Sequence, residues 1–230
     1  MKRFWKEVAV AREADSFGVN LDGRPVRTPA RAPLLLPTER LAEAVAAEWR
    51  DRPEDVDPRG MPLTGLANAA IDRVAPNREA FAAGLARYGE SDLFAYRAEG
   101  PAGLVERQAA AWDPLLQWAR RRFDVDFAVT TGVSFVAQPA DTVRRLGHAV
   151  ASLDVNRLAA LSPLVTIGGS LVAALAVVEG ENTPDQAWEA VAVDENWQLE
   201  KWGEDAEART ALDNRRREFL AAAGFLSLLD

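Results

Sequence analysis

The chain contains no cysteine and only one histidine, His148, among its 230 residues. Without cysteine it has no disulfide, no thiolate nucleophile, no iron–sulfur cluster and no cysteine-ligated zinc site. A single histidine also excludes a metal ion held by several imidazoles. We therefore expect this chain to hold no metal ion and to need no cofactor.

Long apolar runs are also missing. The most apolar stretch, residues 161–178, is interrupted by Ser162, Pro163, Thr166 and Ser170. It falls short of the ~20 consecutive apolar residues that a membrane span needs. The N-terminal sequence Met-Lys-Arg-Phe-Trp-Lys-Glu-Val is not followed by the apolar segment of a secretory signal. We expect a cytoplasmic protein that does not insert into a membrane.

Positive charge is in deficit, with 27 Lys and Arg residues against 35 Asp and Glu residues and a net charge of −8. A protein that binds nucleic acid needs a basic surface to displace the counterions of the phosphates. The basic clusters here are short, Arg120–Arg122 and Arg215–Arg217, and each lies in a segment of helical pattern. A solvated helix face explains them, so we expect no nucleic acid partner.

Apolar residues make up an ordinary 48 % of the chain, and their spacing changes along it. The first 37 residues hold short apolar runs separated by turns, with Asp22-Gly23 as the strongest hairpin signal. Beyond residue 100 the spacing is mostly helical. We predict an α+β fold: a small mixed strand and helix N-terminal domain, residues 1–97, followed by a larger mostly helical C-terminal domain, residues 98–230.

Caps and breakers predict where single elements begin. Thr38 and Thr64 are predicted N-caps, and Pro114 is predicted at the first position of a helix. Leu93–Tyr96 is predicted to be a strand that returns to the N-terminal sheet, and residues 125–136 to be a strand pair or an extended loop. Further helices are predicted at residues 139–153, 155–161, 163–179, 184–202 and 204–224.

No motif for catalysis stands out. Ser170 follows Gly168-Gly169 but lacks the final Gly of a nucleophile elbow, and no Lys follows it as in a phosphate-binding loop. These small residues are better explained by close packing of two helices, and His148 by a structural role in its own helix. We expect no catalytic residue, and we do not expect an enzyme.

Residues 184–202 are predicted to form one helix with well-marked ends. Thr183 and Gln186 form a capping box around Pro184, and Gly203 follows where helices often stop. On a wheel of 100° per residue, the apolar arc of this helix consists of Trp188, Val191, Leu199 and Trp202.

A glutamate lies at the centre of this apolar arc. Glu195 occupies that position, whereas Gln198 lies at the edge of the arc and Glu200 on the opposite, solvated face. A buried carboxylate costs several kcal/mol unless it is paired or neutralised. Three explanations stay open: a buried ion pair with an arginine of segment 115–122 or 209–217, a groove in which Glu195 receives a basic group of a partner, or a helix phase that differs from the one assumed on this wheel.

Tryptophan is plentiful, with seven residues. Most tryptophans serve the core, although aromatic residues are also enriched at binding surfaces. Trp197 lies away from the apolar arc, so it marks either a second packing face or an exposed anchor for a partner.

Several strings together resemble one protein family. They are Arg3-Phe4-Trp5-Lys6, residues 21–29 (LDGRPVRTP), 61–64 (MPLT) with 66–68 and 71–72, 96–98 (YRA), Gln108 with 112–116 (WDPLL), 169–172 (GSLV) and 194–205 (DENWQLEKWGED). In this order, and nearly from end to end, the chain resembles the Atp-twelve family, the assembly chaperones of the ATP synthase catalytic head.

The resemblance implies a non-enzymatic protein that binds the free alpha subunit of the ATP synthase catalytic head and shields the surface that later meets the beta subunit. It also implies a two-domain α+β architecture. The important acidic position of the family matches the segment 194–205, where we assign it to Glu195 first, with Glu200 and Glu204 as alternatives. The partner-binding residues expected from the resemblance and the wheel are Glu195, Gln198, Glu200, Trp202 and Glu204.

Two other functions compete with this interpretation. A small-molecule enzyme, such as a carboxylate-based hydrolase, predicts a deep pocket with convergent carboxylates of perturbed pKa. A structural subunit of a stable complex predicts purification with a partner at fixed stoichiometry. A chaperone predicts a broad, shallow apolar groove with few titratable groups, and we expect this one to be a monomer.

Overall fold

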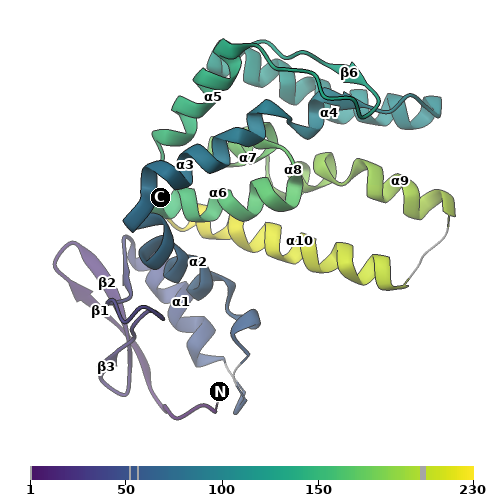
Figure 1. The fold of residues 1–230 in the computed structure, drawn as a ribbon. Helices are drawn as coiled ribbons and strands as arrows, with labels where there is room; N and C mark the ends of the chain where they lie inside the picture. Colours follow the sequence, from purple (N-terminus) through teal and green to yellow (C-terminus); the bar gives the residue numbers. More distant parts are fainter. Residues whose placement is uncertain (1, 52, 56, 203–205) are drawn as a thin grey trace. The chain divides into compact units, whose positions relative to one another are not determined.

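Short strands near the N-terminus and helices through the rest of the chain make up the fold (Figure 1). The α+β class predicted from the sequence, with its larger helical C-terminal part, is therefore confirmed. The computed structural model describes residues 2–51, 53–55, 57–202 and 206–230. Among these residues, no helix has the length and the apolarity that crossing a bilayer requires.

The chain groups into two compact units. Unit 1 comprises Met1–Arg78, Asp154–Ala160 and Gly224–Asp230, and unit 2 comprises Glu79–Leu153 and Leu161–Ala223. The N-terminal unit therefore takes in two segments from much later in the sequence. The domains predicted from the sequence, residues 1–97 and 98–230, have other bounds, and that division stays a prediction.

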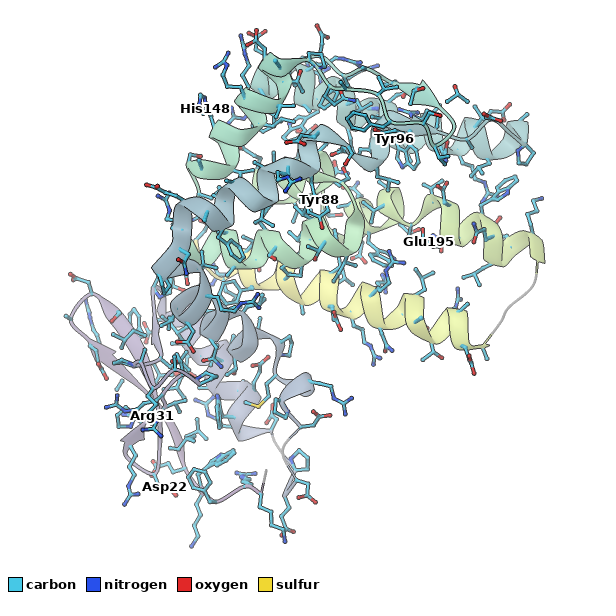
Figure 2. The ribbon with its side chains drawn as sticks, viewed as in Figure 1. Asp22, Arg31, Tyr88, Tyr96, His148 and Glu195 are labelled. Carbon is cyan, nitrogen blue, oxygen red and sulfur yellow. The ribbon has the colours of Figure 1, made fainter. Side chains whose placement is uncertain are left out.

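Unit 1 contains a small antiparallel sheet. The predicted hairpin turn is confirmed, because Asp22 and Gly23 take positive φ angles of 49° and 76° and join two paired strands. The Asp22 carboxylate accepts hydrogen bonds from the N–H groups of Glu7 (2.8 Å) and Lys6 (3.0 Å), which hold its pKa below the usual value (Figure 2). The strands are β1 (Val8–Glu13), β2 (Ser16–Leu21), β3 (Arg24–Pro25) and β4 (Leu35–Leu36), and each of the other three pairs with β2.

Of the two helix caps predicted in unit 1, one is confirmed and the other prediction is wrong. Thr38 Oγ1 accepts from the N–H of Leu41 at 3.1 Å, as predicted. Thr64 is not a cap: the Glu48 carboxylate accepts from the N–H groups of Leu63 and Thr64, both at 2.8 Å, so another helix supplies the cap. The elements are α1 (Glu39–Arg50), η1 (Pro58–Gly60), α2 (Pro62–Ala69), the π-helical η2 (Ala70–Val74) and η3 (Ala75–Asn77).

Unit 2 is built around a buried helix, α7, whose residues 171–176 are almost fully enclosed. Among the described residues of this unit, two short strands, β5 and β6, form a parallel sheet. The elements are α3 (Arg78–Ala86), η4 (Arg87–Glu90), η5 (Leu93–Ala95), β5 (Tyr96–Arg97), α4 (Ala102–Phe123), β6 (Thr130–Thr131), α5 (Ala140–Ala151), α7 (Leu171–Val178), α8 (Pro184–Val191) and α9 (Val193–Trp202). Two further helices, α6 (Val155–Gly168) and α10 (Ala206–Ser227), supply residues to both units.

Two predictions for the middle of the chain are wrong. Residues 93–96 do not return to the N-terminal sheet, because they form η5 and the start of β5, which pairs with β6. Pro114 does not begin a helix, because α4 already starts at Ala102 and carries Pro114 in its interior. An interior proline costs about 3 kcal/mol, and burial of the neighbouring Trp112 and Leu115 offsets that cost. Residues 125–136 form an extended loop that contains β6.

The later helices break at other places than predicted. The predicted break between residues 161 and 163 is absent, since α6 continues through Pro163 to Gly168. The chain turns instead at Gly169, whose φ of 69° suits glycine, and the Ser170 hydroxyl then caps α7 by accepting from Ala173 N at 3.0 Å. The helix predicted over 184–202 is two helices, as described below.

Candidate partner-binding site

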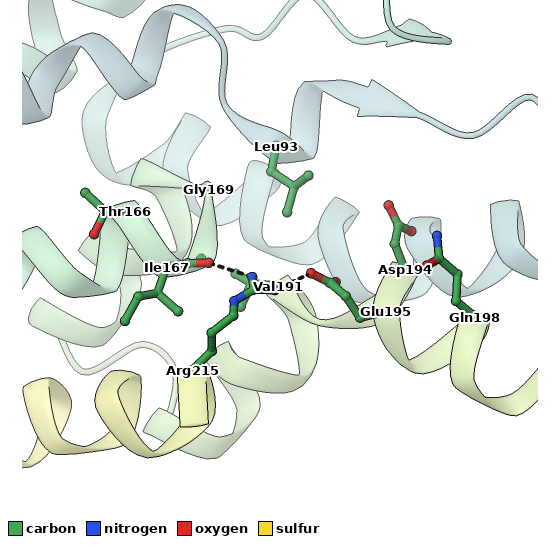
Figure 3. A pocket seen from close by; sticks show the side chains of 10 residues that line it. Leu93, Thr166, Ile167, Gly169, Val191, Asp194, Glu195, Gln198 and Arg215 are labelled. Carbon is green, nitrogen blue, oxygen red and sulfur yellow. Dashed lines mark hydrogen bonds and ion pairs between the residues drawn. The ribbon is translucent and has the colours of Figure 1, made fainter. Parts of the chain in front are cut away.

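An open pocket of about 400 Å³ lies in unit 2, next to the segment that the sequence singled out (Figure 3). It is formed by η5, the end of α6, the neighbouring ends of α8 and α9, and α10. The residues that line it are Leu93, Thr166, Ile167, Gly168, Gly169, Val191, Asp194, Glu195, Gln198 and Arg215.

The charged feature of this pocket is an ion pair between Glu195 and Arg215. Arg215 Nη1 donates to Glu195 Oε1 at 2.9 Å, and its Nη2 donates to the Ile167 carbonyl at the end of α6, also at 2.9 Å. The two side chains remain 37 % and 43 % exposed. An ion pair this exposed contributes only about 0–1 kcal/mol to stability, so a partner's charged group can replace Arg215 at small cost.

The geometry contains features of both the ion-pair and the groove interpretation of Glu195. The expected arginine comes from the 209–217 segment, as Arg215, but the pair is half-exposed rather than buried. Glu195 also lines an open pocket. Its acceptance of a partner's basic group stays a prediction.

The helix that carries Glu195 differs from the predicted one. The capping box is confirmed, because Thr183 Oγ1 accepts from Gln186 N and the Gln186 side chain accepts from Thr183 N. The first helix, α8, ends at Val191. Its C-cap, Ala192, has φ −98° and ψ 13°, and α9 begins at Val193 with a phase of its own. A single wheel through residues 184–202 therefore placed the apolar arc of the second half wrongly.

Trp197 shows the change of phase. The wheel put it away from the apolar arc, yet it forms the contact between α9 and α4. A Cβ atom on Gly103 of α4 would lie 2.9 Å from the Trp197 ring, so only glycine allows this close approach. The Cζ atom of Arg107 and the Nζ atom of Lys201 each lie 4.8 Å from the centre of the Trp197 ring. Trp197 therefore marks a second packing face, one of the two roles that the sequence left open.

The first turn of α9 is tied to α4 by a glutamine. Gln108 Nε2 donates to Asp194 Oδ1 at 2.7 Å, and Gln108 Oε1 accepts from the N–H of Ala98 at 2.8 Å. Gln108 is itself buried. This bond holds Asp194 at the pocket wall beside Glu195 (Figure 3).

The other predicted site residues are spread out. Gln198 lines the pocket and is exposed, so it lies together with Glu195. Glu200 is not among the lining residues: it pairs with Arg107 of α4 at 2.8 Å, and this hydrogen bond lowers the pKa of Glu200. Trp202 ends α9, but its side chain lies outside the described part of the chain, as does the whole of Glu204.

Sequence reasoning missed the floor of the pocket as a site. Gly168 permits a close approach, as expected for close helix packing: a Cβ there would lie 3.2 Å from Val191 Cγ1 and 3.4 Å from the Phe219 ring. Leu93 N donates to the Gly169 carbonyl at 3.0 Å, which fixes η5 against the turn between α6 and α7. The Gly168-Gly169 pair was visible in the sequence, but η5 joins it only through the tertiary fold.

A fully buried aspartate supports this floor from behind. Asp92 accepts hydrogen bonds from the N–H groups of Phe94 (3.0 Å) and Val172 (2.9 Å) and so ties η5 to the start of α7. Burial raises the pKa of Asp92 to about 6, against the opposing effect of its hydrogen bonds.

The arrangement suits binding better than catalysis. The two pocket carboxylates, Asp194 and Glu195, are each hydrogen-bonded to another side chain. Within the described part of the chain, no group of three or more acidic or histidine side chains is placed to hold a metal ion. What the pocket offers is a half-exposed ion pair on an apolar floor.

Solved structures give the class of protein to which this fold belongs, that of the chaperones. Two structures of Atp12 from Paracoccus denitrificans, one of them a point mutant, match the whole chain with a TM-score of 0.94. They are 42 % and 43 % identical in sequence, and each match covers 98 % of the solved chain. A protein from Agrobacterium tumefaciens also matches with a TM-score of 0.94, at 38 % identity over 86 % of its length.

The sequence leads to a particular family. Residues 2–120 match the family model described as ATP12 chaperone protein. The mitochondrial protein atp12 of Schizosaccharomyces pombe is 24 % identical over 238 residues, which covers 98 % of this chain and 82 % of the yeast protein. The chain belongs to the ATP12 chaperone family, as its resemblance in sequence indicated.

Proposed function

We propose that this protein is a chaperone of ATP synthase assembly that binds the free alpha subunit of the catalytic head and covers its beta-facing surface until the beta subunit replaces it. Family membership supports the assembly role. The observation that carries the binding mode is the half-exposed Glu195–Arg215 pair at the mouth of an open pocket.

Glu195 and Gln198 are the proposed primary contacts. A basic side chain of the client enters the pocket, takes the place of Arg215 beside the Glu195 carboxylate and donates to the Gln198 amide. We also propose Glu200, Trp202 and Glu204, which follow Glu195 and Gln198 in the sequence, as further contact residues. The acidic balance of the chain, −8, favours a client surface of opposite charge.

Such a chaperone does not need to hydrolyse ATP. An unassembled subunit exposes a large apolar interface, which is an aggregation liability. A protein that binds this free state and not the assembled one stabilises the free state by mass action. We propose that it works as a monomer in the cytoplasm, without nucleic acid or membrane insertion.

The test is capture of the client. The chain is co-expressed with the alpha subunit of the same organism's ATP synthase, and separately with the beta subunit. The charge reversal Glu195→Lys places an ammonium against Arg215 and against the client's cation, and we expect it to weaken capture of alpha at least tenfold. Glu181→Lys is the matched control, because it makes the same charge change at an exposed residue that does not line the pocket.

The expected pattern is retention of alpha and not beta, lost in Glu195→Lys and kept in Glu181→Lys, with unchanged circular dichroism. Equal loss in both variants would show that only the overall charge matters, which contradicts the pocket. Retention of neither subunit by the wild type would overturn the client assignment and make a search for a small-molecule substrate the next step.

A further inference from the structure

An exposed apolar segment lies in the loop between α4 and α5. Val133 is 98 % exposed, Phe135 69 % and Val129 45 %, and these are three of the five large exposed apolar side chains of the described residues. Single exposed apolar residues are common, but three within seven residues form a patch. We call residues 129–135 the apolar edge.

The apolar edge lies in an uncharged part of a charged protein. Residues 127–140 contain no Asp, Glu, Lys or Arg, although such residues make up 27 % of the chain. Proteins normally protect exposed strand edges with charges or proline, because an unprotected β-prone segment pairs with other chains. Thr and Val dominate residues 129–133, so this segment has strand propensity and carries no charge or proline of its own, and the Glu99 carboxylate lies beside it, next to Gly132.

The backbone of this segment is paired on one side. β6 pairs in parallel with β5, and Gly132 N donates to the Arg97 carbonyl at 2.8 Å. The Gln138 amide bonds both backbone groups of Ala128, at 3.0 and 2.9 Å. Because backbone groups alternate in direction along a strand, the N–H and C=O of Thr131 turn to the opposite edge. β6 ends its two-stranded sheet, so that edge can accept one more strand.

The size of the apolar edge indicates what it binds. Its three apolar side chains expose together at most roughly 500 Å², which is below the ~800 Å² per partner of a stable interface. Pairing with a second copy through this edge alone would be too small, and the charge of −8 on each copy opposes it. The edge therefore fits as one part of a larger contact with a different protein.

The proposed pocket supplies the rest of that contact. Leu93 lines the pocket and begins η5, and β5 follows directly after η5. Three residues span at most roughly 11 Å, so β5 and the paired β6 lie close to the pocket in the same unit. One client can reach both features.

We infer that the apolar edge binds an extended segment of the client as an added β-strand, with apolar side chains of that segment packed on Val133 and Phe135. This rests on the proposed function, since it names a second contact for the same client. It would give the chaperone a strand-pairing contact that recognises exposed backbone as well as charge.

The first experiment measures binding of the full chain to the purified alpha subunit. The double variant Val133→Ser/Phe135→Ser removes apolar surface that is mostly exposed, and we expect it to bind at least tenfold more weakly. The control is Phe4→Ser, which removes an equally exposed phenylalanine, 73 % exposed, from unit 1. We expect the control to bind within twofold of the wild type.

The second experiment separates strand pairing from apolar contact. Thr131→Pro removes an outward N–H, which an edge strand tolerates, whereas Thr131→Ala keeps it. We expect at least fivefold weaker binding for proline and less than twofold for alanine, with thermal unfolding of both close to that of the wild type. Hydrogen exchange at residues 129–133 should slow when alpha is bound.

Each result decides the inference. If the wild type captures alpha, all variants bind it equally well and hydrogen exchange at residues 129–133 is unchanged, the added strand is overturned. The pocket proposal then stands. If the serine variant binds alpha weakly but Thr131→Pro binds it normally, the client contacts the apolar edge without strand pairing, and the added strand is overturned. If sedimentation shows a dimer that the serine variant abolishes, the edge binds a second copy. If the wild type captures no alpha, both proposals fail.

Discussion

At the residue scale, the titratable side chain with the clearest consequence is Asp92. It is fully buried behind the pocket floor, and burial raises its pKa from 3.8 to about 6. The folded state therefore holds this proton more tightly than the unfolded chain does. Protonated Asp92 therefore contributes to the free energy of unfolding. This contribution is complete below about pH 4 and is lost as the pH rises through about 6.

This predicts a pH-dependent difference between the wild type and Asp92→Asn, which does not titrate. Between pH 4 and 7, the unfolding free energy of the wild type should fall by up to about 3 kcal/mol relative to the variant. Urea unfolding of both proteins at several pH values measures this difference. A difference that is flat, or that rises with pH, would mean that the hydrogen bonds from Phe94 and Val172 outweigh burial.

At the scale of elements, the close contact between α4 and α9 depends on one glycine. Gly103 lies against the Trp197 ring, where a Cβ would come within 2.9 Å, whereas Gly84 in α3 has nothing within 4 Å of that position. The same substitution should therefore have opposite effects at the two sites. This contact also sets where α9 presents Glu195.

Gly84→Ala should raise the unfolding free energy by about 0.5–1 kcal/mol, because alanine lowers the backbone entropy of the unfolded chain. Gly103→Ala should lower it by about 1–3 kcal/mol, because the methyl group displaces the Trp197 ring. Chemical denaturation measures both values, and tryptophan fluorescence of the folded Gly103→Ala protein should change. Equal stabilisation by both substitutions would show that Trp197 moves aside freely.

Local chemistry in the sequence predicted the elements that depend on neighbours in the chain. The Asp22-Gly23 hairpin, the Thr38 cap and the Thr183 capping box are examples, and each uses residues at most three positions apart. The prediction at Thr64 was wrong because its cap, Glu48, comes from another helix.

For the candidate site, the sequence singled out a helix segment that lines the pocket but not the pocket's other walls. Glu195 was noticed because a carboxylate interrupts an apolar pattern, and its arginine was limited to two segments. The break at Ala192 carries no glycine or proline, so the phase of α9 could not be predicted from the pattern. The apolar edge was foreseen only as a strand pair or an extended loop.

At the scale of the whole molecule, the chain does not divide into consecutive pieces. Residues 155–160 of α6 and 224–227 of α10 belong to unit 1, whereas the rest of each helix belongs to unit 2. Within unit 1, Thr38 Oγ1 donates to the Leu228 carbonyl and Arg40 to that of Asp230. The last residues of the chain therefore hold the N-terminal end of α1.

This predicts that the protein unfolds in one cooperative transition, because a helix shared by two units cannot melt in one without losing structure in the other. Far-ultraviolet circular dichroism reports all helices, and fluorescence of a variant that keeps only Trp5 and Trp49 reports unit 1. The two urea curves should coincide within error. Separate midpoints would show that the two units unfold independently.

The Glu195–Arg215 pair has a consequence for the lifetime of the proposed complex. When a client's cation leaves the pocket, Arg215 is 2.9 Å from the vacated carboxylate in the unbound structure and can neutralise it again. Dissociation then leaves no unpaired charge, so this contact adds little to the barrier for departure. Such a contact selects the client without prolonging its residence time, which suits a protein that has to give its client up.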